Sequence, residues 1–153
     1  MPENIKAKIK EEIKEFNKLI KKYPNISELY IARAVLYTKI GEYKKAIKDY
    51  AKAHEDYIYD IIAICKRNNL TKEVEEFYTR KINEDKNNTI NYMSRARFYI
   101  SIGENKKALA DCENILKISP GNKLVLEFKK ILIKELEGKN LAKGMSTPKI
   151  FLP

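Results

Sequence analysis

The sequence predicts an all-α fold built from antiparallel helix pairs, and three observations lead there. Residues 30–53 and 92–115 align without gaps and share eleven of 24 positions, which indicates an internal duplication. Apolar residues in both copies recur three and four positions apart, the spacing of one helix face. A glycine, Gly41 or Gly103, separates the two periodic segments of each copy. Glycine readily adopts the positive φ at which many helices end.

The N-terminal segment 3–22 predicts an amphipathic helix that caps the first pair. The pattern Tyr23-Pro24-Asn25 follows it and ends the helix. Such a cap is needed because each pair in a row buries its apolar face only against its neighbours. The predicted apolar face consists of Ile5, Ile9, Ile13, Phe16 and Ile20.

Residues 27–54 predict the first helix pair. Tyr30, Ala34 and Tyr37 share one face of its first helix, and Ala46 and Tyr50 share one face of its second. The small alanines allow the two helices to approach closely, and each large tyrosine fills the space beside an alanine.

Residues 55–88 predict a degenerate second pair. Ile58, Ile62 and Cys65 occupy its first-helix face, and Tyr78 lies on its second helix. Asn69 replaces the turn glycine, and asparagine is the next best residue for a left-handed turn.

Residues 89–122 predict the third pair, and residues 122–137 predict a final helix. Asn122 is its expected N-cap and Gly138 its expected stop. The tail 139–153 has no helical period, and we expect it to be flexible.

The repeated pattern resembles the tetratricopeptide repeat (TPR), a helix-turn-helix unit of 34 residues. The best match, 89–122, has Tyr92, Ala96, Tyr99, Gly103, Ala108 and Pro120 where that family has its aromatic, small, turn and final proline residues. The resemblance implies a right-handed superhelical stack, a TPR-like α-solenoid of about three repeats plus capping helices. It also implies a single domain over 1–138, in which 3–22 is an unpaired second helix.

One spacing departs from this family's pattern. Gly41 and Gly103 are 62 positions apart, six fewer than two full repeats require. We therefore expect the second helix of the first pair to be shortened, with a tight turn near residues 54–56.

The resemblance also implies a concave groove lined by the first helix of each pair. Apolar residues would form its floor, Ile131 of the final helix among them, and basic residues would lie along one side. The alternative is that a short stack closes over these residues and they are simply core. The predicted peptide-binding residues are Ile31, Val35, Lys39, Tyr59, Lys66, Arg67, Met93, Arg97 and Ile100.

Family members that bind chaperone C-termini hold the terminal carboxylate with Lys, Asn and Arg at fixed positions. Those positions are occupied here by Ile31, Val35, Ala63, Met93 and Arg97. Only Arg97 matches, so we expect no binding of chaperone tails.

The sequence offers little catalytic equipment, and we expect no enzyme activity, no catalytic residue, no cofactor and no metal site. The single histidine, His54, has no nucleophile or orienting acid in a recognisable motif, which favours a surface or junction role. Cys65 and Cys112 fall on packing positions and predict buried, reduced thiols.

Charged side chains at packing positions also have a structural interpretation. Arg33 and Arg95 occupy equivalent places in the two copies, which favours ion pairs over anion binding. The acidic run Glu73, Glu75 and Glu76 suits the positive end of a helix dipole better than acid–base chemistry.

The chain has 31 basic and 21 acidic residues, a net charge of +10, with the excess at its two ends. Lysines scattered among glutamates are typical of a solvated face. The leading hypothesis is therefore a non-enzymatic protein-interaction module, or scaffold, for a partner peptide or helix. The alternative is a basic helical-repeat adaptor for nucleic acid, and steep salt dependence would distinguish it.

Three expectations concern the cellular location and the partners of the chain. No signal peptide or membrane span is visible, and the thiols suit a reducing compartment, so we expect a cytoplasmic protein without membrane or specific nucleic-acid partners. The apolar end of the tail, 148–153, could dock in a groove of its own chain or of a second copy, and docking in a second copy would make the chain self-associate.

Overall fold

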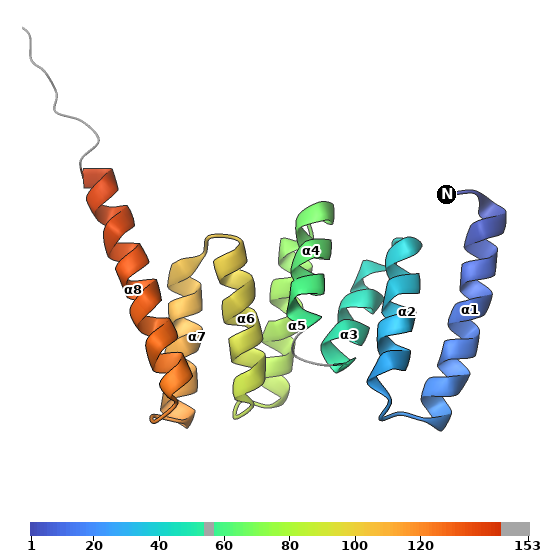
Figure 1. The fold of residues 1–153 in the computed structure, drawn as a ribbon, viewed down its shortest axis with the longest axis horizontal. Coiled ribbons are helices and arrows are strands. Elements are labelled where there is room, and N and C mark those ends of the chain that lie inside the picture. The colour runs from blue at the N-terminus through green and yellow to red at the C-terminus, as the bar shows by residue number, and fades with distance from the viewer. Residues whose placement is uncertain (54–56, 145–153) are drawn as a thin grey trace, which may run out of the picture. The chain divides into compact units, whose positions relative to one another are not determined.

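The computed structural model describes residues 1–53 and 57–144, with side chains described as far as residue 138. These residues form eight α-helices and no β-strand, which confirms the predicted all-α class. The chain divides into two compact units, Met1–Glu84 and Asp85–Pro153, which are described separately (Figure 1). The handedness predicted for a superhelix along the whole chain stays a prediction.

The first unit contains five helices that follow one another antiparallel. Their bounds are α1 Glu3–Lys22, α2 Ser27–Lys39, α3 Tyr43–Ala53, α4 Ile58–Asn68 and α5 Thr71–Glu84.

Helix α1 packs on α2 through one apolar face. Ile9 and Ile13 are buried against Leu36 of α2, with Phe16 packed at the edge of this cluster. Burying each isoleucine contributes about 1.5–3 kcal/mol. Ile5 was predicted on the same face but is 47% exposed, because α2 does not cover the first turn of α1.

The α2–α3 pair shows the predicted close approach. Ala34 and Ala46 are fully buried, and Tyr30 and Tyr50 are buried beside them. Gly41, in the turn between the helices, has φ +80°, as the sequence predicted. Helix α3 is described up to Ala53, where residues outside the described part begin, so its predicted shortening stays a prediction. The predicted turn at 54–56 lies outside the described residues.

The α4–α5 pair is joined as predicted but packs differently. Asn69 ends α4 in the left-handed conformation, with φ 54° and ψ 42°. The buried face of α4 includes Ile58, Ile61 and Cys65, whereas Ile62, predicted on that face, is only half-buried. The two helices approach less closely than α2 and α3, because Ile62 and Val74 stand where the other pair has alanine.

The second unit contains three helices, α6 Thr89–Ser101, α7 Asn105–Ile118 and α8 Lys123–Gly144. The α6–α7 pair repeats the α2–α3 arrangement: Ala96 and Ala108 are fully buried and Gly103 has φ +81°. Asn88 caps α6, since its side chain accepts a hydrogen bond from the backbone N–H of Ile90 at 3.1 Å.

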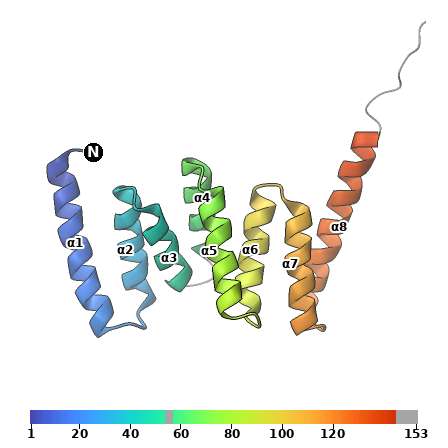
Figure 2. The same cartoon turned by 180° about the vertical axis from the view of Figure 1, so that it is seen from behind.

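Helix α8 begins where predicted but ends later. The Asn122 side chain accepts a hydrogen bond from the Val125 N–H at 3.2 Å, which confirms the N-cap. The predicted stop at Gly138 is wrong: the helix runs to Gly144, and Gly138 lacks the positive φ of a helix-ending glycine. Figure 1 and Figure 2 show that α8 projects beyond α7. The predicted tail therefore starts with helix, and residues 145–153 lie outside the described part.

Candidate functional site

The exposed face of α2 carries the predicted residues of the first pair. Val35 is 39% exposed and Lys39 is exposed, while Ile31 beside them is half-buried. Glu28, one turn before Ile31, is also exposed. These residues share a face because they are spaced three and four positions apart.

The exposed face of α4 carries Tyr59, the aromatic residue of the predicted site. Tyr59 is 67% exposed. Ala63, Lys66 and Arg67 follow it on the same face and are also exposed. A large exposed aromatic next to cations is the composition that binding surfaces favour.

The second unit presents a more apolar face. Met93, Arg97 and Ile100 of α6 are half-buried, and Ile90 at the start of the helix is 50% exposed. On α8, Ile131 is 55% exposed.

The exposure of one residue of α8 was not predicted from the sequence. Leu124 is 68% exposed and lies two turns before Ile131 on the same side of the helix. Its spacing of seven residues from Ile131 is the sequence feature that could have predicted a shared face.

None of the nine predicted binding residues is buried within its own unit. Within the first unit the structure places Ile31, Val35 and Lys39 on α2 and Tyr59, Lys66 and Arg67 on α4; the other three residues belong to the second unit.

Arginines at equivalent places form the same clamp in both units, which confirms their predicted structural role. Arg33 donates two hydrogen bonds to Asp49, both at 2.7 Å. Arg95 donates two to Asp111, at 2.9 and 2.7 Å. The hydrogen bond to the aspartate raises the pKa of each arginine. Each clamp ties the first helix of a pair to the second.

The carboxylate of Asp111 is only 2% exposed. Burial raises its pKa, and this effect outweighs the opposing hydrogen bond and charge of Arg95. The second-unit clamp is therefore an ion pair held in a largely dry setting.

Both cysteines are buried thiols, as predicted. Burial raises the pKa of each, and that of Cys112 to about 11. Because a thiol with such a pKa stays protonated at neutral pH, neither cysteine is an activated nucleophile.

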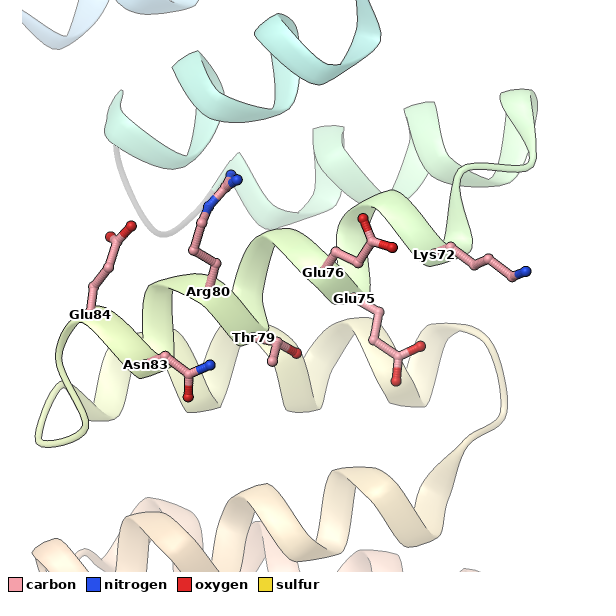
Figure 3. Close-up of a pocket in the computed structure, with 7 residues that line it drawn as sticks. All are labelled: Lys72, Glu75, Glu76, Thr79, Arg80, Asn83 and Glu84. Carbon is pink, nitrogen blue, oxygen red and sulfur yellow. The ribbon is translucent and has the colours of Figure 1, made fainter.

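The acidic residues of α5 lie along a shallow hollow of about 530 Å³ (Figure 3). Figure 3 shows Glu76, Arg80 and Glu84 on one side of the helix and Glu75 and Asn83 on the other. The residues lining it are Lys72, Glu75, Glu76, Thr79, Arg80, Asn83 and Glu84.

The mixture of charges in this hollow fits a solvated helix face better than an acid–base centre. Glu73 stands in the first turn of α5, where a carboxylate favours the helix dipole. The Arg80 guanidinium lies 6.0 Å from the Phe77 ring. Within residues 1–53 and 57–138, no group of three histidine, cysteine or acidic side chains has the arrangement of a metal site. No helix among the described residues has the length and apolar character that crossing a membrane requires.

Comparisons with known proteins find one matching family model and several similar solved structures. A family model described as Tetratricopeptide repeat matches residues 15–48, from the end of α1 through α2 into α3. No curated protein sequence matches the chain.

Several solved structures are similar. The first TPR of Spaghetti (RPAP3), bound to the HSP90 peptide SRMEEVD, is 17% identical, covers 72% of this chain and 93% of its own, and has a TM-score of 0.46. MamA is 22% identical over 90% of this chain and 82% of its own, with a TM-score of 0.48. YrrB, described as a TPR protein with an unusual peptide-binding site, is 14% identical over 86% and 71%, with a TM-score of 0.47.

The matched segment contains the first helix pair up to Lys48, and the duplicated α6–α7 pair has the same alanines, turn glycine and clamp. The match identifies a tetratricopeptide repeat in residues 15–48, and the described helices form antiparallel pairs of the kind that this repeat builds.

Proposed function

We propose that the chain is a non-enzymatic protein-interaction module for a peptide or helix of another protein. The proposed binding surfaces are the outer faces of α2 and α4 in the first unit and the outer face of α6 in the second unit. The observation that carries the proposal is the exposure of Val35 and Tyr59, 39% and 67%, on helices whose other faces are buried. Exposed apolar and aromatic side chains with cations beside them are typical of interaction sites. The proposed contact residues are Ile31, Val35, Lys39, Tyr59, Lys66, Arg67, Met93, Arg97 and Ile100.

The chemistry of this face defines the partner. Apolar anchors of the partner would cover Val35 and Tyr59, and acidic side chains would face Lys39, Lys66 and Arg67. Buried apolar contacts supply affinity, whereas rim charges mainly set orientation and association rate. A chaperone C-terminal tail is not the proposed partner, because only Arg97 of the family's clamp positions is kept.

An affinity pull-down from native lysate tests the proposal with paired variants of the full chain. Tyr59→Ala/Arg97→Glu removes the exposed aromatic and reverses one charge. The control, Tyr23→Ala/Lys117→Glu, also removes one tyrosine ring and reverses one positive charge, at two exposed residues outside the proposed face.

We expect a protein recovered with wild type and with the control to be lost with Tyr59→Ala/Arg97→Glu. Circular dichroism of all three proteins shows whether each is folded. If the two variants retain every recovered protein equally, these residues do not form the binding face.

A further inference from the structure

The outer faces of α2 and α4 share a polarity that runs along each helix. Helix α2 has Glu28 in its first turn and Lys39 in its last. Helix α4 has Asp60 in its first turn and Lys66 and Arg67 in its last. All five side chains are exposed, and apolar side chains lie between the two charged ends.

This polarity distinguishes the first unit from the second. Helix α6, the counterpart of α2 in the duplicated pair, has no acidic residue in its first turn and no basic residue in its last. Its outer face instead begins with Ile90, 50% exposed, and has Arg97 near its middle. The order of charges is therefore a property of α2 and α4 and does not come with every repeat.

The two polar helices point the same way. Helix α3 returns between them, and Figure 1 shows the C-terminal ends of α2 and α4 at the same edge of the first unit. On these two helices the C-terminal end is positive, through Lys39, Lys66 and Arg67, and the N-terminal end is negative, through Glu28 and Asp60. Between Glu28 and Lys39, eleven residues of helix correspond to about 16 Å.

We infer that this face binds an amphipathic helix of a partner protein antiparallel to α2 and α4. The occupant has acidic residues in its N-terminal turns, an apolar stripe of about three turns, and basic residues in its C-terminal turns. This inference rests on the proposed function and adds the conformation and direction of the bound segment.

Two independent electrostatic effects favour that direction. Natural helices gather acidic residues at their N-terminus and basic residues at their C-terminus, because those charges favour the helix dipole. Antiparallel placement sets the partner's acids over Lys39, Lys66 and Arg67 and its bases over Glu28 and Asp60. It also opposes the two sets of backbone dipoles. Parallel placement would set like charges against each other at both edges.

The same polarity disfavours nucleic acid on this face. A phosphate backbone is negative along its whole length, so Glu28 and Asp60 would repel one end of any strand lying along the helices. A helix with charges of both signs meets no such repulsion.

Two synthetic peptides of identical composition test the inference. Both are helices of about 16 residues with the same leucine stripe; one has glutamates first and lysines last, and the other has the reverse order. Both carry an i,i+4 covalent cross-link on the outer face, and circular dichroism verifies equal helicity. Fluorescence anisotropy then measures the affinity of each for the full chain at 50 mM and 1 M salt.

We expect the acid-first peptide to bind about tenfold more tightly at 50 mM salt, since each exposed charge pair contributes little by itself and several act together. The difference should fall below about twofold at 1 M salt, where the Debye length is about 3 Å. The charge-inverted variant Glu28→Lys/Lys39→Glu/Lys66→Glu should prefer the other peptide, provided that it folds.

The outcomes separate the direction from the proposed function. Equal binding of the two peptides, or tighter binding of the base-first peptide to wild type, overturns the inferred direction and leaves a binding face. No binding of either peptide to wild type overturns the inference together with the part of the proposed function assigned to α2 and α4.

Discussion

The buried clamp between Arg95 and Asp111 makes a quantitative prediction about stability. Replacing Asp111 by Asn removes the negative charge and turns one acceptor into a donor that faces the guanidinium. Arg95 has a side chain only 15% exposed and would stay charged there without its counter-ion. Removing one partner of a buried ion pair costs about 3–5 kcal/mol. We expect about 3 kcal/mol, because Arg95 keeps the Tyr99 ring at 5.8 Å.

Replacing both partners should cost much less. Burial raises the pKa of Asp111 despite Arg95, so the pair is charged at a cost in desolvation. The double variant Arg95→Met/Asp111→Leu removes both charges and keeps similar volumes. Such exchanges are often close to neutral. We expect its cost to be at least 2 kcal/mol below the sum of the two single variants.

Amide hydrogen exchange followed by mass spectrometry measures the loss of stability separately in each compact unit of the full chain. Asp111→Asn should speed exchange in α6 and α7 about 100-fold, the equivalent of about 3 kcal/mol. Asp49→Asn, the matched change in the first unit, should act on α2 and α3 instead. The reasoning is refuted if Asp111→Asn costs under about 1 kcal/mol, or if the double variant costs as much as the two singles together.

Three further predictions concern single residues. Gly103→Ala should destabilise the chain by about 1–2 kcal/mol, since its φ of +81° is strained for alanine, whereas Gly138→Ala should stabilise it by up to about 1 kcal/mol in urea unfolding. Asn122→Ala should cost about 1 kcal/mol through the lost N-cap of α8, and Asn122→Asp should retain most of it. Stability should fall between pH 9 and 11, because the folded thiol of Cys112 keeps its proton up to about pH 11 while the unfolded thiol has lost it. The free energy of unfolding should fall by about 2–3 kcal/mol over this pH range. Cys112→Ala should show a correspondingly shallower pH dependence, and an unchanged slope would contradict the assignment.

Features fixed by local chemistry were predictable from the sequence. Gly41, Gly103 and Asn69 occupy positive-φ positions that few other residues tolerate, so their place in the pattern identified the turns. Asn122 identified the start of α8 because its side chain can accept a hydrogen bond from a free N–H group of the first helical turn.

Features that depend on neighbouring helices were not predictable in the same way. Gly138 looks like a helix end in sequence, but glycine also fits a helix interior at a cost of about 1 kcal/mol. In α4, isoleucines at 58, 61, 62 and 64 satisfy more than one helix face, and the choice of Ile61 over Ile62 depends on where α3 and α5 lie. The identity of the exposed residues was predictable from spacing, but their role in binding was not.

The internal duplication separates what holds the helix pairs together from what they present. The alanines, the turn glycine and the arginine–aspartate clamp are identical in the two pairs. The outer-face residues all differ: Glu28 corresponds to Ile90, Ile31 to Met93, Val35 to Arg97 and Lys39 to Ser101. Because the clamp and the alanines lie within each pair, outer-face residues can change without disturbing the packing. A graft of the four α2 outer-face residues onto α6 should therefore fold, and this scaffold can accept new recognition surfaces one helix at a time.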